Sequence, residues 1–451
     1  MFKPKIGLVT VALPPELSTV PPEAVQIADD LGERAEESLS KAGLEVIRIK
    51  EQAGDEKASV SATKKLVDAG VDALIYLVGT WIYVPMVVTP TRDLKTPFIL
   101  WGVPDMTLGS LVPSCITHGS LDEMGIEHKF VYGWPEDKTL VDNITKFSRA
   151  AMVVNRMDGM RYGLFGGRCM YMYTGMPDLI QVKKIFGVET VHIDEFMLVK
   201  RAESIEKQKV TEFLNDFKKK YGKIEPSDDV MEKSVRLYFA LKEMVKENDL
   251  DFVGLKCMPE VQGNYCSHCL SVALNNSEGL VSACEADTNG ALTMEILHLL
   301  SGSAAGFGDV FKIDKKEGEV RLVNCGSVAV EFATSKKDID WGLQYDFIAP
   351  GPGRGATPAF VCKPGRITLA RLARIKGEYV MEIATGEAYS EPKEKMKEAR
   401  AIWPHIFFKL DGDPEKFLQN CRSNHQHWTY GDYKEELIEV CRLFGIKPIV
   451  V

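Results

Sequence analysis

The sequence has no long hydrophobic run, no surplus of cysteine and no excess of basic charge. Its longest apolar stretch, residues 73–88, contains Gly79 and Pro85 and is too short to span a bilayer. The 10 cysteines are irregularly spaced and close to background frequency, so they do not predict a disulfide framework. With 55 basic and 64 acidic side chains the net charge is −9, which disfavours nucleic acid and anionic membranes as partners.

The first residues also lack the features of a signal peptide. A charged start, Met-Phe-Lys-Pro-Lys, leads into apolar residues 6–13, and no small-residue cleavage site follows. We interpret residues 6–13 as a strand and expect a cytoplasmic protein in a reducing environment. The content of 45% hydrophobic and 26% charged residues, without repeats or low-complexity tracts, is typical of globular domains.

At about 150 residues per domain, the chain of 451 residues predicts three domains. In residues 1–150, and again in residues 151–305, short β-rich runs alternate with amphipathic helical stretches. This alternation indicates βαβ units and parallel sheets of the flavodoxin-like or Rossmann-like kind. The strands predicted for these two domains are 6–13, 44–49, 73–78, 98–102, 129–132, 161–165, 188–193, 251–257 and 280–284. A helix over 140–158 is predicted to connect the two domains.

Residues 306–451 have a different, β-rich pattern that ends in a predicted helix over 433–444. The strands predicted here are 309–313, 319–324, 328–334, 360–362, 366–375 and 378–386. Short strands at this spacing indicate an antiparallel barrel or sandwich. The predicted fold class is therefore α/β, with two parallel-sheet domains followed by a C-terminal β-barrel-like domain.

Two carboxylates follow neighbouring strands of the second predicted sheet. Glu260 comes just after the strand over 251–257, and Asp287 just after the strand over 280–284. Ligands of open α/β sheets bind at this carboxyl edge, and strands one βα unit apart are usually adjacent. The two carboxylates are thus expected to converge, where they would share a proton or hold a cation. Each could instead cap the helix that follows its strand.

A histidine pair near the C-terminus supplies a third candidate group. His425 and His427 lie two residues apart, and hence on one face if that segment is extended. Two carboxylates and an imidazole suit Mn²⁺ or another divalent ion with mixed oxygen and nitrogen preference. Histidines packed on the surface against Trp428 are the alternative interpretation.

Several ordered segments of the chain resemble the L-fucose isomerase family, within the wider L-fucose/L-arabinose isomerase group. The resemblance extends from about residue 256 to the C-terminus. Its segments are Cys284-Glu-Ala-Asp-Thr-Asn-Gly290, Asn324-Cys-Gly-Ser-Val-Ala, Lys363-Pro-Gly-Arg-Ile-Thr-Leu-Ala-Arg371 and Asn424-His425.

The resemblance implies two α/β domains and a barrel-like domain in a homo-oligomer, a trimer or hexamer, with active sites completed by a neighbouring subunit. It carries the family's metal ligands onto Glu260, Asp287 and His425, with Mn²⁺ as the usual ion. The segment around Glu260 departs from the family pattern, so that assignment rests on its place after a strand. The sugar does not carry over, beyond an open-chain pentose or 6-deoxyhexose.

The predicted reaction is aldose-ketose isomerisation. A divalent ion polarises the sugar carbonyl and stabilises an enediolate, while Glu260 and Asp287 move a proton between C2 and C1, in an order that the sequence leaves open. Glu285 either orients a ligand or is solvated. A non-catalytic sugar-binding protein and a metal-dependent aldolase or lyase are the alternative functions.

Five further residues are candidate sugar contacts, each with a structural alternative. Trp81 follows a strand of the first domain and could stack on a sugar or pack in the core. His118 could serve a neighbouring subunit's site, although helix capping by Ser120 explains much of its segment. Arg168 follows a glycine turn and could bind a hydroxyl or form an interdomain ion pair. The remaining two candidates, next to His425, are Asn424 and Trp428.

Overall fold

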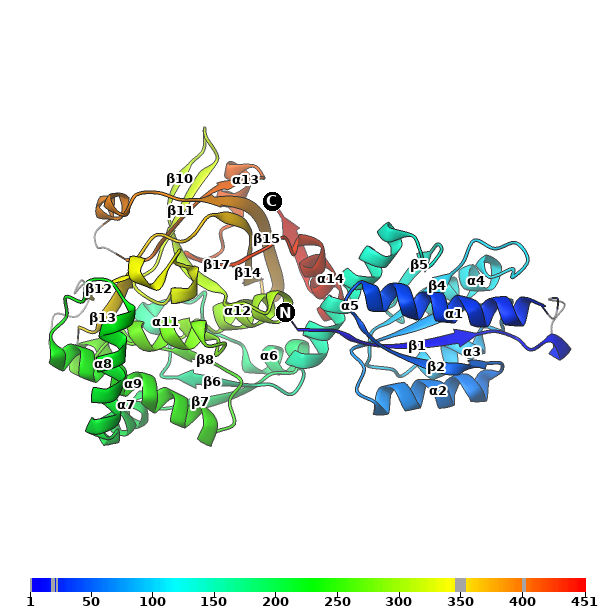
Figure 1. Cartoon of the computed structure of the whole chain (residues 1–451), viewed down its shortest axis with the longest axis horizontal. Coiled ribbons are helices and arrows are strands. Elements are labelled where there is room, and N and C mark those ends of the chain that lie inside the picture. Colours follow the sequence, from blue (N-terminus) through cyan, green and yellow to red (C-terminus); the bar gives the residue numbers. More distant parts are fainter. Residues whose placement is uncertain (1, 18–20, 22, 345–353, 400–402) are drawn as a thin grey trace. The chain divides into compact units, whose positions relative to one another are not determined.

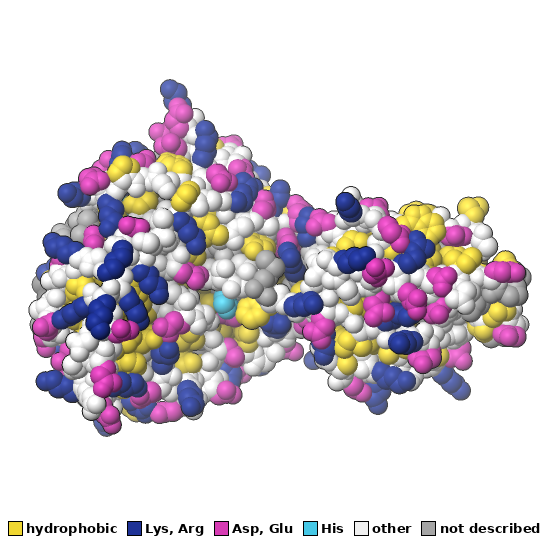
Figure 2. All heavy atoms as spheres, in the orientation of Figure 1, with side chains coloured by type: hydrophobic (Ala, Val, Ile, Leu, Met, Phe, Trp, Pro, Cys, Tyr) yellow, Lys and Arg dark blue, Asp and Glu magenta, His cyan; other side chains and the backbone are white. Residues whose placement is uncertain are grey.

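The chain forms two compact units in the computed structural model (Figure 1), which describes all residues except 1, 18–20, 22, 345–353 and 400–402. The N-terminal unit contains residues 2–156 and 435–443, and the main unit contains 157–434 and 444–451. Among the described residues, no helix combines the length and apolarity needed to cross a membrane. Basic and acidic side chains are interspersed over both units on the face shown in Figure 2.

The N-terminal unit is a parallel five-stranded sheet of order β2-β1-β3-β4-β5 with helices on both faces. Its strands are β1 (Lys5–Val11), β2 (Glu45–Ala53), β3 (Ala73–Val78), β4 (Phe98–Gly102) and β5 (Lys129–Tyr132). Its helical elements are η1 (Pro15–Leu17), α1 (Glu23–Lys41), α2 (Glu56–Asp68), α3 (Pro85–Thr91), α4 (Leu111–Glu123) and α5 (Lys138–Met157). Alternating residues of β1 enter two different cores: Ile6 and Leu8 pack with α1 and α5, and Val9 and Val11 with α2 and α3.

The main unit begins with a second parallel sheet, of order β7-β6-β8-β9. Its strands are β6 (Arg161–Phe165), β7 (Glu189–Ile193), β8 (Phe252–Leu255) and β9 (Ser282–Cys284). The accompanying helical elements are η2 (Cys169–Tyr171), α6 (Leu179–Phe186), α7 (Glu195–Ser204), α8 (Lys207–Lys220), α9 (Asp228–Glu247), α10 (Glu260–Asn264), α11 (Cys269–Ser277) and α12 (Thr288–Ser301). The chain turns to opposite sides after β6 and after β8, so their carboxyl ends mark the topological switch point at which ligands bind.

A closed six-stranded antiparallel barrel completes the main unit, with order β14-β17-β10-β11-β16-β15 and a final β14–β15 pairing. Its strands are β10 (Gly306–Asp314), β11 (Glu319–Val323), β14 (Gly365–Ile375), β15 (Glu378–Tyr389), β16 (His405–Leu410) and β17 (His425–Tyr430), and β18 (Lys447–Val450) adds to β15 in parallel. The smaller elements of the main unit are η3 (Val330–Phe332), η4 (Lys336–Asp338), β12 (Asp340–Leu343), β13 (Ala356–Ala359), η5 (Lys393–Glu398) and α13 (Pro414–Asn420). Nearly all of α14 (Lys434–Phe444) belongs to the N-terminal unit. The predicted fold class is confirmed.

Two of the predicted C-terminal strands are absent as strands. Residues 328–334 contain the 3-10 turn η3, whose Val330 and Phe332 are buried in the core. Residues 360–362 make only isolated bridges, of Val361 with His405 and of Cys362 with Ala333. The apolar and β-branched residues of these segments are typical of strands. Here their side chains are buried in the core, although the backbone forms no continuous β-ladder.

Candidate active site

The turn between β9 and α12 directs two acidic side chains into the main unit. Glu285 and Ala286 both have left-handed backbone conformations, with φ of 59° and 52°. Such conformations cost on the order of 1 to 3 kcal/mol for each non-glycine residue and are concentrated at functional sites. Asp287 follows as the N-cap of α12, where its Oδ1 accepts a hydrogen bond from Gly290 N at 2.9 Å. The helix-capping alternative is therefore correct for Asp287, but capping is not its only contact.

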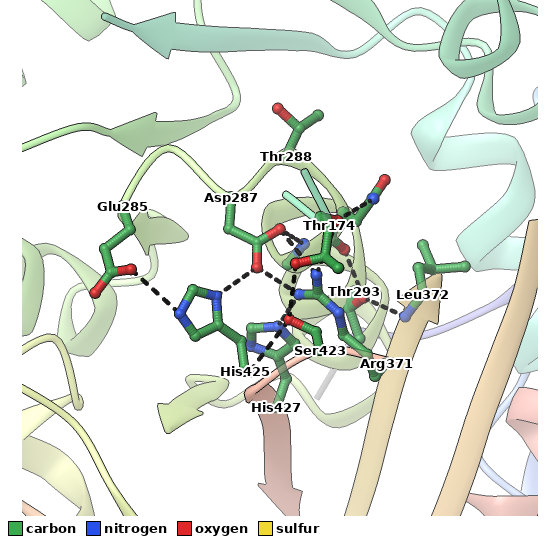
Figure 3. Close-up of polar contacts among 12 residues, drawn as sticks. Thr174, Glu285, Asp287, Thr288, Thr293, Arg371, Leu372, Ser423, His425 and His427 are labelled. Atoms are coloured by element: carbon green, nitrogen blue, oxygen red, sulfur yellow. Dashed lines mark hydrogen bonds and ion pairs between the residues drawn. The ribbon is translucent and has the colours of Figure 1, made fainter. Parts of the chain in front are cut away.

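The barrel strand β17 brings His425 between these carboxylates (Figure 3). Its Nδ1 donates to Asp287 Oδ2 at 2.7 Å, and its Nε2 lies 3.3 Å from Glu285 Oε2. The paired strand β10 places Asp309 opposite, with Oδ1 at 3.7 Å from the same Nε2. One imidazole thus contacts three carboxyl groups that come from two parts of the main unit.

Arg371 of β14 binds Asp287 from the other side with a two-pronged ion pair. Its Nη1 lies 2.5 Å from Oδ2 and its Nη2 lies 3.1 Å from Oδ1, and both side chains are 1% exposed. Nη1 also lies 3.0 Å from Nε2 of His427, which shares a face of β17 with His425. Asp287 therefore has both of its oxygens occupied by fixed donors.

The charges of the cluster set the protonation of its members. Burial alone would raise the pKa of Asp287, but the charges of Arg371 and His425 outweigh it and hold this pKa well below its usual range. Burial alone would lower the pKa of His425, yet Glu285 and Asp287 raise it to about 10. Burial raises the pKa of Asp309 to about 6 against the pull of His425, although a third of that side chain reaches solvent. Burial and the Arg371 charge keep His427 neutral by lowering its pKa well below the ordinary value.

Comparison with known proteins agrees with this architecture. The sequence profile of the family described as L-fucose isomerase, C-terminal domain, matches residues 322–450. The sulfoquinovose isomerase of Alkalicoccus urumqiensis is 22% identical over 387 residues, which cover 84% of this chain and 86% of the relative. That of Clostridium sp. (strain MSTE9) is 25% identical over 369 residues, or 78% and 80% of the two chains. The chain is thus similar to the L-fucose isomerase family in its C-terminal part and to sulfoquinovose isomerases over most of its length.

These similarities confirm the predicted resemblance, and the chain is an aldose-ketose isomerase. A solved periplasmic solute-binding protein of Actinobacillus succinogenes with bound D-allose covers 67% of this chain and 93% of its own. Its sequence identity of 13% and TM-score of 0.19 carry no argument about fold or function.

In this isomerase, the residues predicted as metal ligands are only partly brought together. Asp287 and His425 are in direct contact, whereas Glu260 lies on the rim at the start of α10. Its side chain is 54% exposed and forms an ion pair with Lys256 at 2.7 Å. In the described structure the acid beside His425 is instead Glu285, because it follows β9 directly while Glu260 stands five residues beyond β8.

The predicted sugar contacts near the barrel differ in position. Asn424 adjoins the cluster, since its Nδ2 donates to Asp309 Oδ1 at 2.6 Å. Trp428 has the opposite parity to His425 and His427 along β17, and it is buried against Gly306 and Gly308. The structure therefore does not place Trp428 with the cluster.

None of the contacts described for Asp287 involves Arg168, Trp81 or His118. Arg168 is exposed in the loop after β6 and stacks on Tyr173, with Cζ 4.8 Å from the ring centre. Trp81, 39% exposed, and His118 belong to the N-terminal unit. Their roles as sugar contacts stay predictions.

The loop after β6 forms backbone hydrogen bonds with the cluster, which the sequence analysis did not predict. The carbonyl of Thr174 accepts from Arg371 Nη2 at 3.3 Å and from Asn289 Nδ2 at 2.8 Å. Gly175 O accepts from Thr288 N at 3.0 Å, and a Cβ at Gly175 would lie only 3.2 Å from Asp287 Cα. A side chain at this position would be tightly packed, and one of the two backbones would have to shift by a few tenths of an ångström.

A further, partly buried acid lies at the same sheet edge. Glu195, the first residue of α7, packs over Gly166, and its Oε1 has no hydrogen-bond partner among the described residues. Burial raises its pKa to about 8. No sequence motif marked it, because an acid in the first turn of a helix is ordinary.

Proposed function

We propose that this isomerase is metal-dependent and that its reaction centre is the cluster around His425. The observation that carries the proposal is an excess of buried negative charge: Glu285, Asp287 and Asp309 surround one imidazole, and Arg371 supplies one permanent positive charge. Carboxylates gathered in a buried site are costly unless protons or a cation balance them. A divalent cation fits this donor set.

The donors favour Mn²⁺ or a similar ion, because carboxylate oxygens and an imidazole nitrogen are its preferred ligands. Glu285 Oε2 and His425 Nε2 are both buried and make no well-aligned hydrogen bond in the described structure. The carboxylate oxygens of Asp287 already accept hydrogen bonds from Arg371, Gly290 N and His425 Nδ1. We therefore infer that Glu285, Asp309 and His425 Nε2 hold the ion and that Asp287 orients the imidazole, as outer-shell carboxylates do.

The ligand set implied by the family resemblance is the alternative. It contains Glu260, which would have to leave Lys256 and turn inward, together with Asp287 and His425. The two sets share His425 and differ in both carboxylates, which are Glu285 and Asp309 in the first set and Glu260 and Asp287 in the second. This difference makes them separable by substitution.

When bound, the divalent ion polarises the sugar carbonyl and stabilises negative charge on the adjacent oxygens. Asp287 is held ionised at a pKa far from neutrality, so it is a poor proton carrier. Glu285 lies beside His425 and accepts no well-aligned hydrogen bond through Oε2 in the described structure, so we propose it as the base that takes the C2 proton. Glu260 on the rim is the remaining candidate for the acid that returns it.

The substrate proposed is an open-chain pentose or 6-deoxyhexose, and the relatives add sulfoquinovose, a sugar with a sulfonate, as a specific candidate. Arg168 is an exposed cation in the loop after β6, stacked on Tyr171 and Tyr173. Such a guanidinium suits a sulfonate as well as a hydroxyl.

We further propose a cytoplasmic homo-oligomer, a trimer or hexamer, in which Trp81 and His118 of one subunit serve the site of a neighbour. All ten cysteines are free thiols in the structure, which supports a reducing compartment.

Metal content separates the two ligand sets. The proposal predicts that Glu285→Gln loses bound Mn²⁺ and isomerase activity, while Glu260→Gln keeps the metal and loses only turnover. If Glu260→Gln loses the metal and Glu285→Gln keeps it, the set of the resemblance is correct instead. If wild-type protein isomerises sugars fully after metal removal, metal dependence itself is wrong.

A further inference from the structure

A second group of potential metal ligands lies within the N-terminal unit. His118 and Asp122 are one turn apart on α4, and His128 lies just before β5. Their donor atoms all lie within 4.8 Å of one another. The group contains two imidazoles and one carboxylate, the ligand types of Zn²⁺ and related transition-metal ions.

The two imidazoles point a nitrogen at each other. His118 Nδ1 and His128 Nε2 are 2.8 Å apart, while His128 Nδ1 lies 2.9 Å from the carbonyl oxygen of Ile126. A carbonyl only accepts, so the proton of a neutral His128 belongs on Nδ1 and its Nε2 carries a lone pair. That lone pair faces His118, where a proton or a metal ion must lie between the rings.

Neighbouring side chains hold both rings in this orientation. Phe98 stacks on His128 at 5.8 Å and 16°, and Phe130 stacks on His118 at 4.8 Å and 25°. Asp122 Oδ2 lies 3.6 Å from His118 Nε2. A hydrogen-bonded far nitrogen and fixed ring planes are the outer-shell support typical of histidine metal ligands.

Solvent can reach the group from one side. The side chains of His118 and Asp122 are 38% and 63% exposed, whereas His128 is 8% exposed. The site is thus anchored by a buried ligand and open where water or another molecule would complete the coordination.

We propose that His118, Asp122 and His128 bind a divalent transition-metal ion of the Zn²⁺ class, at a site separate from the Asp287 cluster. The ion replaces the proton between the two rings, and Asp122 balances part of its charge. The inference uses one unit alone and does not depend on the sugar reaction.

Zinc stoichiometry tests the proposal, with the full chain and Zn²⁺ alone as the probe. Equilibrium dialysis of wild-type protein, His118→Gln and His192→Gln would count the ions bound per chain; His192 is an exposed histidine of the main unit. We expect wild type and His192→Gln to bind one ion more than His118→Gln. Equal binding by wild type and His118→Gln, or equal losses in both variants, would overturn the proposal.

A second variant keeps the test sharp if His118→Gln folds poorly. Asp122→Asn alters only an exposed side chain, and we expect it to weaken zinc binding at this site by about tenfold or more. Unchanged affinity in Asp122→Asn would show that the three residues do not form one site. Neither readout depends on activity, so the predicted sugar contact of His118 does not affect the outcome.

Discussion

At the scale of single residues, Arg371 and Asp287 are the most tightly coupled pair of the site. Both are buried, and the two-pronged contact neutralises a carboxylate that also orients His425. Removing one partner of a buried ion pair leaves the other charge uncompensated, which is more damaging than losing the contact itself.

We predict that Arg371→Met lowers the free energy of unfolding by about 3 to 5 kcal/mol, because Asp287 then stays buried without its counter-charge. Arg374→Met on the same strand is the control. Arg374 donates to the carbonyl of Met176, so its substitution leaves no buried carboxylate without a counter-charge. Urea denaturation of the two variants measures the difference. Equal losses in the free energy of unfolding would show that the Arg371–Asp287 ion pair does not contribute more to stability than the Arg374 contact.

A buried acid outside the site gives a prediction of pH dependence. Glu295 of α12 is 4% exposed, and burial raises its pKa to about 8. The unfolded chain releases this proton near the ordinary pKa of 4.5, so the protein loses stability as pH rises from there to about 8. Glu295→Gln removes this dependence and is expected to raise the unfolding temperature at pH 8 relative to wild type, but not at pH 4.

Thermal unfolding at both pH values measures this effect. If Glu295→Gln and wild type lose stability in parallel between pH 4 and pH 8, Glu295 is not held protonated by the fold.

At the scale of elements, the site is built where a loop, a turn and a barrel strand meet. The loop after β6 lies against the turn after β9 through Gly175 and Thr288, and it accepts from Arg371 of β14 through Thr174. The backbone of one element therefore holds side chains of two others in place.

Gly175→Ala is expected to reduce activity, by less than the roughly hundredfold loss of an ångström-scale misplacement, because the new Cβ would lie 3.2 Å from Asp287 Cα and displace the loop by only a few tenths of an ångström. Gly167→Ala is a matched control in the same loop, since a Cβ there meets nothing within 4 Å. Steady-state kinetics of both variants test this. Similar activities would mean that the close approach at Gly175 does not position the site.

The element scale also explains which parts of the site the sequence could predict. Buried apolar runs and their spacing identified the strands of both parallel sheets, and positions just past β9 and in β17 identified Asp287 and His425. Arg371 and Asp309 were missed because their convergence depends on the β14–β17 and β10–β17 pairings. Glu285 was predicted either to orient a ligand or to be solvated, and its place beside His425 depends on two left-handed residues. Spacing along the chain carries no signal for these features.

The side-chain positions of Glu260 and Trp428 also depend on features that spacing along the chain does not show. A position after a strand predicts the correct sheet edge for Glu260, but the α10 start and Lys256 determine where the side chain goes. Trp428 lies next to His425 and His427 in sequence, and strand parity sends it to the opposite face.

At the scale of the whole molecule, the proposed oligomer implies composite active sites. Trp81→Ala alters the N-terminal unit and Asp287→Asn the main unit, and each homo-oligomer should be nearly inactive. In mixed oligomers, some sites combine the wild-type Trp81 of one subunit with the wild-type Asp287 of a neighbour. We predict that co-refolding or co-expressing the two variants restores part of the activity, as measured by sugar interconversion.

Full activity of the Trp81→Ala oligomer alone would show that Trp81 does not contribute to the active site. Inactive mixed oligomers, with mixing shown by mass spectrometry, would contradict a site shared between subunits.

The central claim, a metal-dependent sugar isomerase centred on Asp287 and His425, is tested most directly by NMR of a sugar panel in D₂O. The panel contains pentoses, 6-deoxyhexoses and sulfoquinovose, each incubated with Mn²⁺-loaded wild-type protein and with Asp287→Asn. We predict aldose-ketose interconversion of at least one sugar by wild type, with deuterium at the transferred carbon, and none by Asp287→Asn. Binding without interconversion, cleavage to a shorter carbonyl product, or full activity of Asp287→Asn would contradict the account.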